Sequence, residues 1–252
     1  MLLQRDEGRV EVVAEQAALA ERFGLERLED VFAREGEVRP EGIKSLVRID
    51  AEGESLYVKR YEFRPARELL RGALKLNPPI YSGPRELHNL LAMAEAGLRV
   101  PTPIAAGEAD AGGRRRSFVA LRQLAGHPLS ELPAPADPLA RRALLNQLAD
   151  LVGRLHRAGF WHRDLYACNV FVAPEGLGLL DCERVGRREG LPRRRWRIKD
   201  LAALDYSLEW PSERERLRVL YRYLAGDAPL SAWARAVRRK AERIAGHGKK
   251  GP

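Results

Sequence analysis

The chain has 252 residues, of which 45% are hydrophobic and 31% are charged, a balance typical of folded globular proteins. This composition excludes a disordered chain, and the length suffices for one large domain or two small lobes. Lys and Arg number 44 against 35 Asp and Glu, so the net charge of +9 favours anionic partners. The two cysteines, Cys168 and Cys182, lack CxxC spacing, which argues against a disulfide framework or a zinc site.

The sequence carries no sign of export or membrane insertion. Residues 1–13 include three acidic residues and lack the apolar core of a signal peptide. No stretch approaches the roughly 20 apolar residues that span a bilayer. We therefore expect a cytoplasmic protein that is at most peripheral to a membrane.

The first half of the chain predicts strands around one helix. Residues 46–49 and 56–61 form an expected hairpin across the turn at 50–53. A helix follows Ser82-Gly83-Pro84, with apolar residues at helical spacing, and Gly97 is placed to end it. Residues 117–121 predict another strand. The proline-rich stretch 126–138 then reads as a connector.

The second half predicts mostly helices. A strong helix over residues 141–157 ends before Gly159, and strands at 170–172 and 177–180 flank a turn at 174–176. Further helices are expected over 200–206, 213–224 and 231–244. The sequence therefore predicts a bilobal α+β fold. Residues 1–125 form a small β-rich lobe with one main helix, residues 126–252 form a mostly helical lobe, and a ligand cleft is expected between them.

The segment from His162 to Asn169 has the spacing HRDxxxxN, which is found in the catalytic loop of protein kinases. A carboxylate at Asp164 can orient an attacking hydroxyl and accept its proton. The side-chain oxygen of Asn169 can reach a magnesium ion bound to phosphates. Asp181 follows twelve residues later at the end of an apolar strand and supplies the hard oxygen ligand that magnesium prefers. Cys182 and Glu183 follow it in place of the Phe-Gly of protein kinases.

Two residues of the first lobe complete the pattern. Lys59 lies inside a predicted strand, where its ammonium group can reach the α- and β-phosphates of ATP. Glu86, on the following helix, is its expected ion-pair partner. The GxGxxG loop that usually covers the phosphates is absent, so backbone amides of residues 51–54 or 35–42 are the candidates for that contact. Each residue alone has a structural explanation, but five in the required order favour a kinase.

The sequence resembles the lipopolysaccharide core kinases (the Kdo/WaaP family) between about Glu37 and Ser207. The resemblance rests on the catalytic loop, on residues 57–61 (YVKRY) and on residues 195–204 (RWRIKDLAAL). It implies ATP and Mg²⁺ as cosubstrates and a heptose, or less favourably a Kdo, hydroxyl of the lipopolysaccharide core as acceptor. It implies Asp164 as the general base, Asn169 and Asp181 as metal ligands, and Lys59 with Glu86 as the phosphate anchor. Asp200 matches an aspartate that braces the catalytic loop.

Basic residues suggest two further contacts. The arginines between 187 and 197 follow Asp181, where they can bind carboxylates and phosphates of a glycan or simply form a solvated loop. The helix at 231–244 has a basic side that can lie on the anionic inner membrane, although such helices more often pack their apolar face on the protein. Two alternatives remain: a protein or small-molecule kinase of the same fold, and a non-catalytic basic pseudokinase scaffold. No nucleic-acid partner is expected, because no known module is visible.

Overall fold

The computed structural model describes residues 1–34, 37–41, 43–51, 53–64, 81–226 and 228–248. The chain forms two compact units, one of Met1–Ala92 with Pro101–Gln123 and one of Met93–Val100 with Leu124–Pro252. The sequence predicts a single division between residues 125 and 126. The units differ from this because Arg99 pairs with a strand of the second unit: its carbonyl accepts a hydrogen bond from the Leu179 amide at 2.8 Å.

The first unit is built on an antiparallel seven-stranded sheet in the order β1-β2-β6-β7-β5-β4-β3. The strands are β1 (Leu2–Arg5), β2 (Val10–Val13), β3 (Glu37–Glu41), β4 (Lys44–Ala51), β5 (Glu54–Phe63), β6 (Thr102–Ala111) and β7 (Arg114–Arg122). The predicted hairpin is confirmed, with Val47 opposite Val58. Both strands extend beyond the predicted ranges because pairing continues to Lys44 and Ala51 in β4 and to Glu54 and Phe63 in β5. Strand β5 lies between β4 and β7, so the residues of β5 occupy an inner strand of the sheet.

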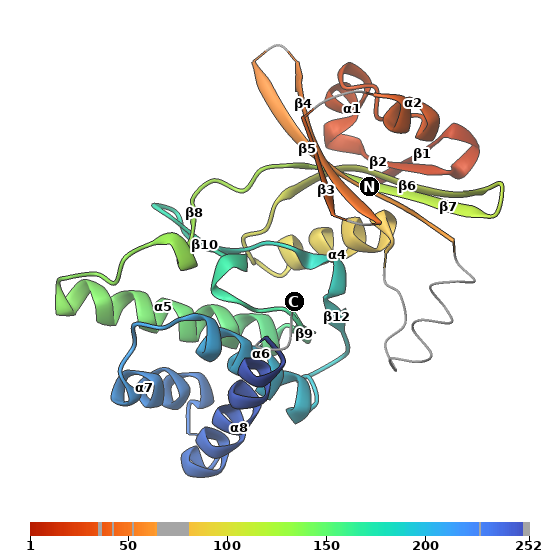
Figure 1. The fold of residues 1–252 in the computed structure, drawn as a ribbon. Helices are drawn as coiled ribbons and strands as arrows, with labels where there is room; N and C mark the ends of the chain where they lie inside the picture. The colour runs from red at the N-terminus through yellow and green to blue at the C-terminus, as the bar shows by residue number, and fades with distance from the viewer. Residues whose placement is uncertain (35–36, 42, 52, 65–80, 227, 249–252) are drawn as a thin grey trace. The chain divides into compact units, whose positions relative to one another are not determined.

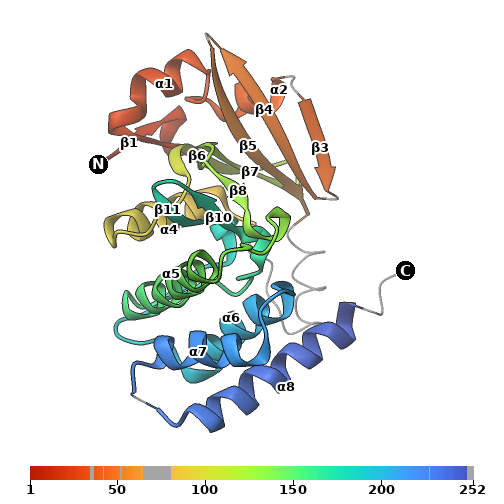
Figure 2. The same cartoon turned by 90° about the vertical axis from the view of Figure 1, so that its left-hand side faces the viewer.

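Helices cover both faces of this sheet, as Figures 1 and 2 show. The short helices α1 (Ala17–Arg22) and α2 (Leu28–Ala33) pack on one face through a buried cluster that includes Phe23, Leu28, Leu56 and Val58. The predicted main helix, α4 (Gly83–Glu95), packs on the other face. The two short helices, and the one-turn helices η1 (Asp6–Gly8) and η2 (Ala14–Gln16), were not predicted. They are too short to display a helical repeat of apolar residues.

Helix α4 begins in close contact with strand β7. A Cβ atom on Gly83 would lie 1.7 Å from the carbonyl oxygen of Phe118, so a residue with a side chain does not fit there. The Gly83 amide donates to the buried Ser117 Oγ at 2.8 Å, which ties the start of the helix to the sheet. At the other end Gly97 has a φ of +74°, which glycine adopts without strain. The sequence predicts both ends of this helix correctly.

The second unit contains four long helices and two small sheets. The helices are α5 (Pro138–Arg157), α6 (Arg194–Ser207), α7 (Glu213–Leu224) and α8 (Leu230–Gly248); α5 packs on α7 and α6 on α8. The strands are β8 (His127–Pro128), β9 (Phe160–Trp161), β10 (Val170–Ala173), β11 (Gly176–Leu179) and β12 (Gly186–Arg187), and one-turn helices lie at η3 (Leu129–Glu131), η4 (Ala167–Asn169) and η5 (Cys182–Arg184). The order β11-β10-β8 forms one sheet, and β9 pairs with β12. The predicted hairpin at 170–180 is confirmed.

Two helices of this unit begin earlier than predicted. Asp137 caps α5 by accepting hydrogen bonds from the amides of Leu139 and Ala140, and Pro138 suits the first helical turn. Helix α6 begins at Arg194, six residues before the predicted start. Its first turn is anchored by Trp196, whose ring stacks on Trp161 with centroids 5.9 Å apart. A contact between two aromatic residues that are far apart in the sequence leaves no periodic signal in it.

Helix α8 buries its apolar face, including Trp233, Val237 and Ala241, within the second unit. This is the packing that the sequence offers as the alternative to a membrane-bound face. Within the described ranges, none of the helices combines the length and the apolar character needed to cross a bilayer. Any contact of α8 with lipid would therefore use its charged residues rather than this face.

Candidate active site

The predicted ion pair of the first unit is confirmed. The Lys59 Nζ atom lies 2.7 Å from Glu86 Oε1, and the glutamate is almost fully buried. Lys59 comes from the inner strand β5 and Glu86 from the first turn of α4. The Tyr61 hydroxyl lies 3.5 Å from Glu86 Oε2, which adds a contact from the same face of β5. The pair therefore holds one cation at a fixed place on the sheet.

Asp200 of α6 binds the backbone of the catalytic loop in the second unit. Its Oδ2 atom accepts a hydrogen bond from the His162 amide, and its Oδ1 atom accepts one from the Arg163 amide, each at 2.7 Å. Arg163 has a φ of +74°, so the chain turns sharply just before Asp164. The two hydrogen bonds stabilise this turn, which most side chains adopt only under strain. Asp200 thus has the bracing contacts that the family resemblance implies.

Asp200 is itself held within a buried network. Its side chain is fully buried, and its Oδ2 atom lies 3.2 Å from His156 Nε2. The His156 Nδ1 atom lies 2.8 Å from the Tyr223 hydroxyl, which also accepts a hydrogen bond from Arg197 Nε at 2.5 Å. Burial raises the pKa of Tyr223, so the phenol stays neutral. Helices α5, α6 and α7 therefore converge on one carboxylate beneath the loop.

The Asp164 carboxylate lies among cations that the sequence did not single out. Arg184 Nη1 donates to both of its oxygens at 3.0 and 2.9 Å, and Lys199 Nζ lies 3.8 Å from Oδ1. Asp164 retains 19% of its side-chain exposure and Lys199 retains 23%, so neither is sealed from a ligand. Burial lowers the pKa of Lys199, and the Asp164 carboxylate opposes that shift. A carboxylate held this way is oriented, as a general base must be.

Asn169 and Asp181 are brought close by the backbone. The Leu180 amide donates to the Asn169 carbonyl at 2.9 Å, so Asp181 follows directly beside the loop. The Asn169 Nδ2 atom donates to the Asp164 carbonyl at 2.9 Å, which leaves its side-chain oxygen for another partner. Asp181 has left-handed backbone angles of 56° and 57° at the start of η5.

The donors fit a magnesium ion. One amide and one carboxylate oxygen are the hard ligands that Mg²⁺ prefers, and a nucleotide-bound Mg²⁺ takes only one or two ligands from protein. Across the described residues, no group of three or more His, Cys, Asp or Glu side chains is placed to hold a metal without such help. The residues therefore suit a metal that arrives with phosphates rather than a resident metal centre.

His162 has a structural place in this loop. It is fully buried, and its Nε2 atom donates to the Leu180 carbonyl at 2.9 Å, which links the loop to the strand before Asp181. The loop is tied at its other end as well, because the Ala167 amide donates to Ser207 Oγ on α6 at 2.7 Å. Helix α6 thus holds the loop at both ends.

Several arginines of the predicted anion-binding stretch stack on aromatic rings. Arg195 lies over Trp196 at 4.8 Å, and Arg163 lies over the same ring at 5.4 Å. Arg194 and Arg197 lie over Trp233 at 5.1 and 4.7 Å. These contacts orient the guanidinium groups and retain their charge.

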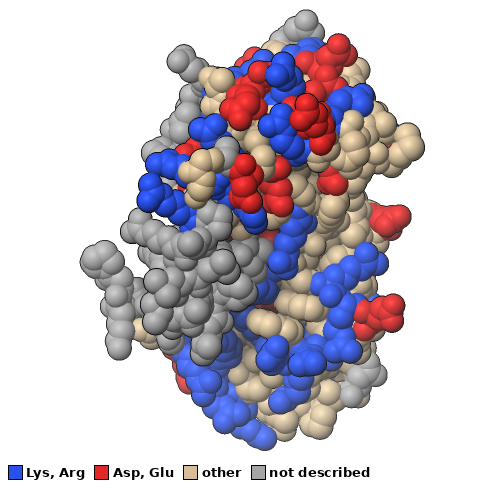
Figure 3. Space-filling model, turned by 90° about the vertical axis from the view of Figure 1, so that its right-hand side faces the viewer, with Lys and Arg blue, Asp and Glu red and all other residues tan. Residues whose placement is uncertain are grey.

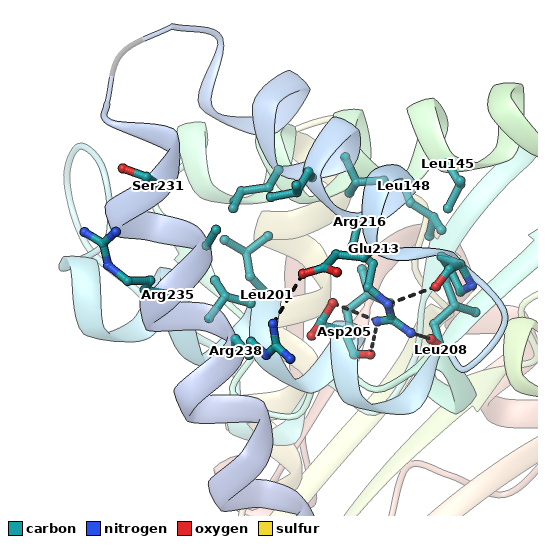
Figure 4. Close-up of a pocket in the computed structure, with 17 residues that line it drawn as sticks. Leu145, Leu148, Leu201, Asp205, Leu208, Glu213, Arg216, Ser231, Arg235 and Arg238 are labelled. Atoms are coloured by element: carbon teal, nitrogen blue, oxygen red, sulfur yellow. Dashed lines mark hydrogen bonds and ion pairs between the residues drawn. The ribbon is translucent and has the colours of Figure 1, made fainter.

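An apolar cavity of about 580 Å³ lies among helices α5, α6, α7 and α8 (Figure 4). Leucines from these helices make up much of its wall, among them Leu148, Leu201 and Leu217. Arg216 also lines the cavity. Its guanidinium group donates hydrogen bonds to Asp205 Oδ1 and to the Leu208 carbonyl, each at 2.7 Å, and is therefore already paired. The exposed Arg235 and Arg238 line it from α8, and Arg238 pairs with Glu213 at 3.3 Å. The cavity is suited to an apolar ligand with polar groups at its edge.

The structure thus brings the predicted residues together in two sets. Lys59 and Glu86 meet in the first unit, and Asp164, Asn169 and Asp181 share one loop region of the second. Of the backbone stretches proposed to cover phosphates, residues 35, 36, 42 and 52 lie outside the described residues. Arg184 and Lys199 were missed. The one available signal for Lys199 was its place directly before the bracing aspartate.

Comparisons with known proteins identify the family of the chain. The model of the lipopolysaccharide kinase (Kdo/WaaP) family matches residues 25–223. The lipopolysaccharide core heptose(I) kinase WaaP of Pseudomonas aeruginosa is 31% identical over 250 residues, which cover 88% of this chain and 91% of the relative. A 3-deoxy-D-manno-octulosonic acid kinase of Xylella fastidiosa is 32% identical over 124 residues, covering 49% of this chain and 48% of the relative.

A solved structure described as WaaP in complex with acyl carrier protein superposes with a TM-score of 0.69 at 27% identity. It covers 97% of this chain and 99% of the compared chain. The fold is therefore the bilobal kinase-like α+β fold that the sequence predicts. The match extends through both units and includes the catalytic loop. The chain belongs to the lipopolysaccharide kinase (Kdo/WaaP) family.

Proposed function

We propose that this protein transfers the γ-phosphoryl group of ATP to a hydroxyl of a heptose in the lipopolysaccharide core. The observation that carries the proposal is the Asp164 carboxylate on a braced loop, with Arg184 and Lys199 beside it. The relative named as a heptose(I) kinase matches 88% of the chain, whereas the relative named as an octulosonic acid kinase matches 49%. The longer match supports heptose as the acceptor.

In this proposal Asp164 orients the acceptor hydroxyl and takes its proton as the oxygen attacks the γ-phosphorus. The new bond joins that oxygen to phosphorus, the bond to the bridging oxygen of ADP breaks, and ADP leaves. Lys59, fixed by Glu86, holds the α- and β-phosphates. Asn169 and Asp181 would hold Mg²⁺, which neutralises phosphate charge when it is bound. Catalysis then rests on positioning and charge rather than on a covalent intermediate.

The test is transfer of labelled phosphate from ATP to a dephosphorylated lipopolysaccharide core, with Mg²⁺ present. Loss of the base in Asp164→Asn should reduce kcat by about 10²- to 10⁴-fold, the usual range for general base catalysis. Asp150→Asn, on the exposed side of α5, is the matched control and should retain full activity. Label on a protein or on a small molecule, with none on the core, would replace this proposal by another acceptor.

We also propose that the chain associates with an acyl carrier protein, as the relative in the solved complex does. The supporting observation is the apolar cavity of about 580 Å³, because an acyl chain needs an apolar enclosure of this kind. Arg235 and Arg238 line the cavity and can contact polar or acidic groups of a carrier.

The measurement is binding of acylated and unacylated carrier protein to the purified chain. Leu217→Glu places a charge in the cavity and should abolish the preference for the acylated form. Tyr221→Glu is the control, since it lies on the same helix, is 64% exposed and does not line the cavity. Equal binding of both carrier forms, unaffected by Leu217→Glu, would contradict the acyl-chain site.

For location, we propose the cytoplasm, with peripheral contact between the basic side of α8 and the anionic inner membrane. The support is the net charge of +9 and the exposed arginines of α8. Sedimentation with anionic liposomes at low salt tests the contact. A chain that stays in the supernatant would exclude it.

A further inference from the structure

A second cavity, of about 490 Å³, lies between helices α6 and α8. Its eight described lining residues are Arg195, Trp196, Ile198, Lys199, Ala236, Arg239, Lys240 and Arg243. Five of them are cationic and none is acidic. Figure 3 shows one side of the molecule, and among the charged side chains in the lower part of this view Lys and Arg predominate.

Two of the five cations of this wall lack an ion pair within the described part of the chain. Arg239 and Lys240 form no ion pair with any residue that the structure describes. Their neighbour on α8, Arg238, differs in that it pairs with Glu213 at 3.3 Å and with Glu242 at 3.6 Å. Gathering like charges in a hollow destabilises the fold unless an anion neutralises them. Arg239 and Lys240 are therefore available to an anionic ligand.

Lys199 links the cavity to the proposed base. This residue lines the cavity, and its Nζ atom lies 3.8 Å from Asp164 Oδ1. A hydroxyl that donates its proton to Asp164 must lie within hydrogen-bond distance of that carboxylate. Groups of the same acceptor that lie beyond this hydroxyl can then reach Lys199 and the cavity. Trp196 adds an aromatic surface, with Arg195 stacked over it at 4.8 Å, against which a sugar ring can pack.

We propose that this cavity between α6 and α8 binds the carboxylate of an acidic sugar adjacent to the phosphorylated one. The inference rests on the proposed function and names the feature of the acceptor that the enzyme recognises. Guanidinium and ammonium groups bind carboxylates through charge-assisted hydrogen bonds. A recessed site linked to the proposed base through Lys199 favours a group on the acceptor itself over a lipid headgroup on a flat surface. Arg239 and Lys240 are thus specificity residues, and Lys199 connects them to the reaction.

The experiment measures binding and turnover with a delipidated, dephosphorylated core oligosaccharide and with the same oligosaccharide after its carboxyl groups are reduced to alcohols. Binding is followed by tryptophan fluorescence, because Trp196 lines the cavity. Lys240→Glu and Arg239→Glu are compared with Arg218→Glu, which makes the same charge change on the exposed side of α7. Each cavity variant should weaken binding of the intact oligosaccharide and raise its KM by about tenfold or more, with the KM for ATP unaltered.

Carboxyl reduction should weaken binding to wild type by a similar factor and leave the cavity variants little further affected. If wild type binds both oligosaccharides equally, or if the cavity variants bind as Arg218→Glu does, the inference is wrong. Loss of binding only to anionic vesicles, with oligosaccharide binding intact, would reassign the cavity to lipid and also overturn it. Failure of wild type to phosphorylate the core, with carboxylate-dependent binding retained, would refute the proposed reaction and leave this site standing.

Discussion

The network around Asp200 yields a quantitative prediction for Asp200→Asn. The carboxylate is fully buried and accepts hydrogen bonds from the amides of His162 and Arg163 at 2.7 Å each. Asparagine keeps the shape but offers one acceptor oxygen, so its NH₂ group must face one of these two N–H donors. A hydrogen bond to a charged group is worth about 1.5–3 kcal/mol, and an unsatisfied buried donor costs about 1–3 kcal/mol. We expect the free energy of unfolding to fall by about 2–4 kcal/mol.

The same substitution should reduce activity in the folded protein. The amides of residues 162 and 163 directly precede Asp164, so releasing one of them moves the base. A misplacement of about 1 Å costs about 10²-fold in rate. We therefore expect kcat to fall by about that factor, with a smaller change in the KM for ATP.

Urea unfolding and steady-state kinetics check both numbers. The control is Asp150→Asn, whose exposed carboxylate pairs with Arg222 and should cost no more than about 1 kcal/mol. Should Asp200→Asn fail to fold, Ser207→Ala removes the tether to the Ala167 amide, together with the hydrogen bond that Ser207 Oγ donates to the Ala203 carbonyl within α6, and should lower kcat in a stable protein. A folded Asp200→Asn protein with kcat within twofold of wild type would refute the bracing role.

Three further substitutions test the site and the fold. Glu86→Gln should lower kcat/KM for ATP at least tenfold, because Lys59 loses its charged partner; steady-state kinetics with unchanged values would contradict this. Because burial lowers the pKa of Lys199, this side chain loses its proton at a lower pH than an ordinary lysine. The rate should therefore fall on the alkaline side, and Lys199→Arg should move that limb to higher pH, since arginine stays charged; an identical pH–rate profile would oppose it. Hydrogen bonds from an arginine and a serine lower the pKa of Glu215 from 4.5 to about 2. Because this pKa is lower in the folded than in the unfolded state, the ionised Glu215 stabilises the protein above pH 4.5, and the stabilisation is lost as the pH falls toward 2. The loss of unfolding free energy caused by Glu215→Gln, measured by urea unfolding, should therefore shrink between pH 4.5 and pH 2.

The sequence predicts the elements whose signals are local. The hairpin of β4 and β5 alternates apolar residues, and α4 has both a repeat and glycines at its ends. Helices α1 and α2 have six residues each, which is too short for a repeat, and they are defined instead by burial of residues such as Phe23 and Leu28 on the sheet. Strand β2 likewise depends on pairing with β6, far along the chain, and β1 depends in turn on β2. Elements fixed by distant partners leave no pattern in their own residues.

The residues of the candidate site likewise include some with a local signal in the sequence and some whose positions depend on distant contacts. The HRDxxxxN spacing identifies Asp164 and Asn169 because the loop itself sets their separation. The contact of Lys59 with Glu86 was predicted because a strand and the next helix bring them together. Arg184 was missed, although it lies closest to the base among the cations, because its position depends on η5 and the left-handed turn at Asp181. A turn of this kind is not predicted from residue type when the residue is an aspartate.

Helix α6 explains why the segment RWRIKDLAAL is distinctive. Residues on one helix perform four separate tasks around the loop: Trp196 stacks on Trp161, Lys199 approaches the base, Asp200 holds two loop amides and Ser207 holds a third. Since these contacts share one rigid element, a rotation of α6 would change the base, its cation and the loop at once. Displacement of the helix by a ligand in either neighbouring cavity would therefore alter the rate as well as the affinity. In the proposed reaction, the position of α6 would therefore couple acceptor binding to the charge around Asp164.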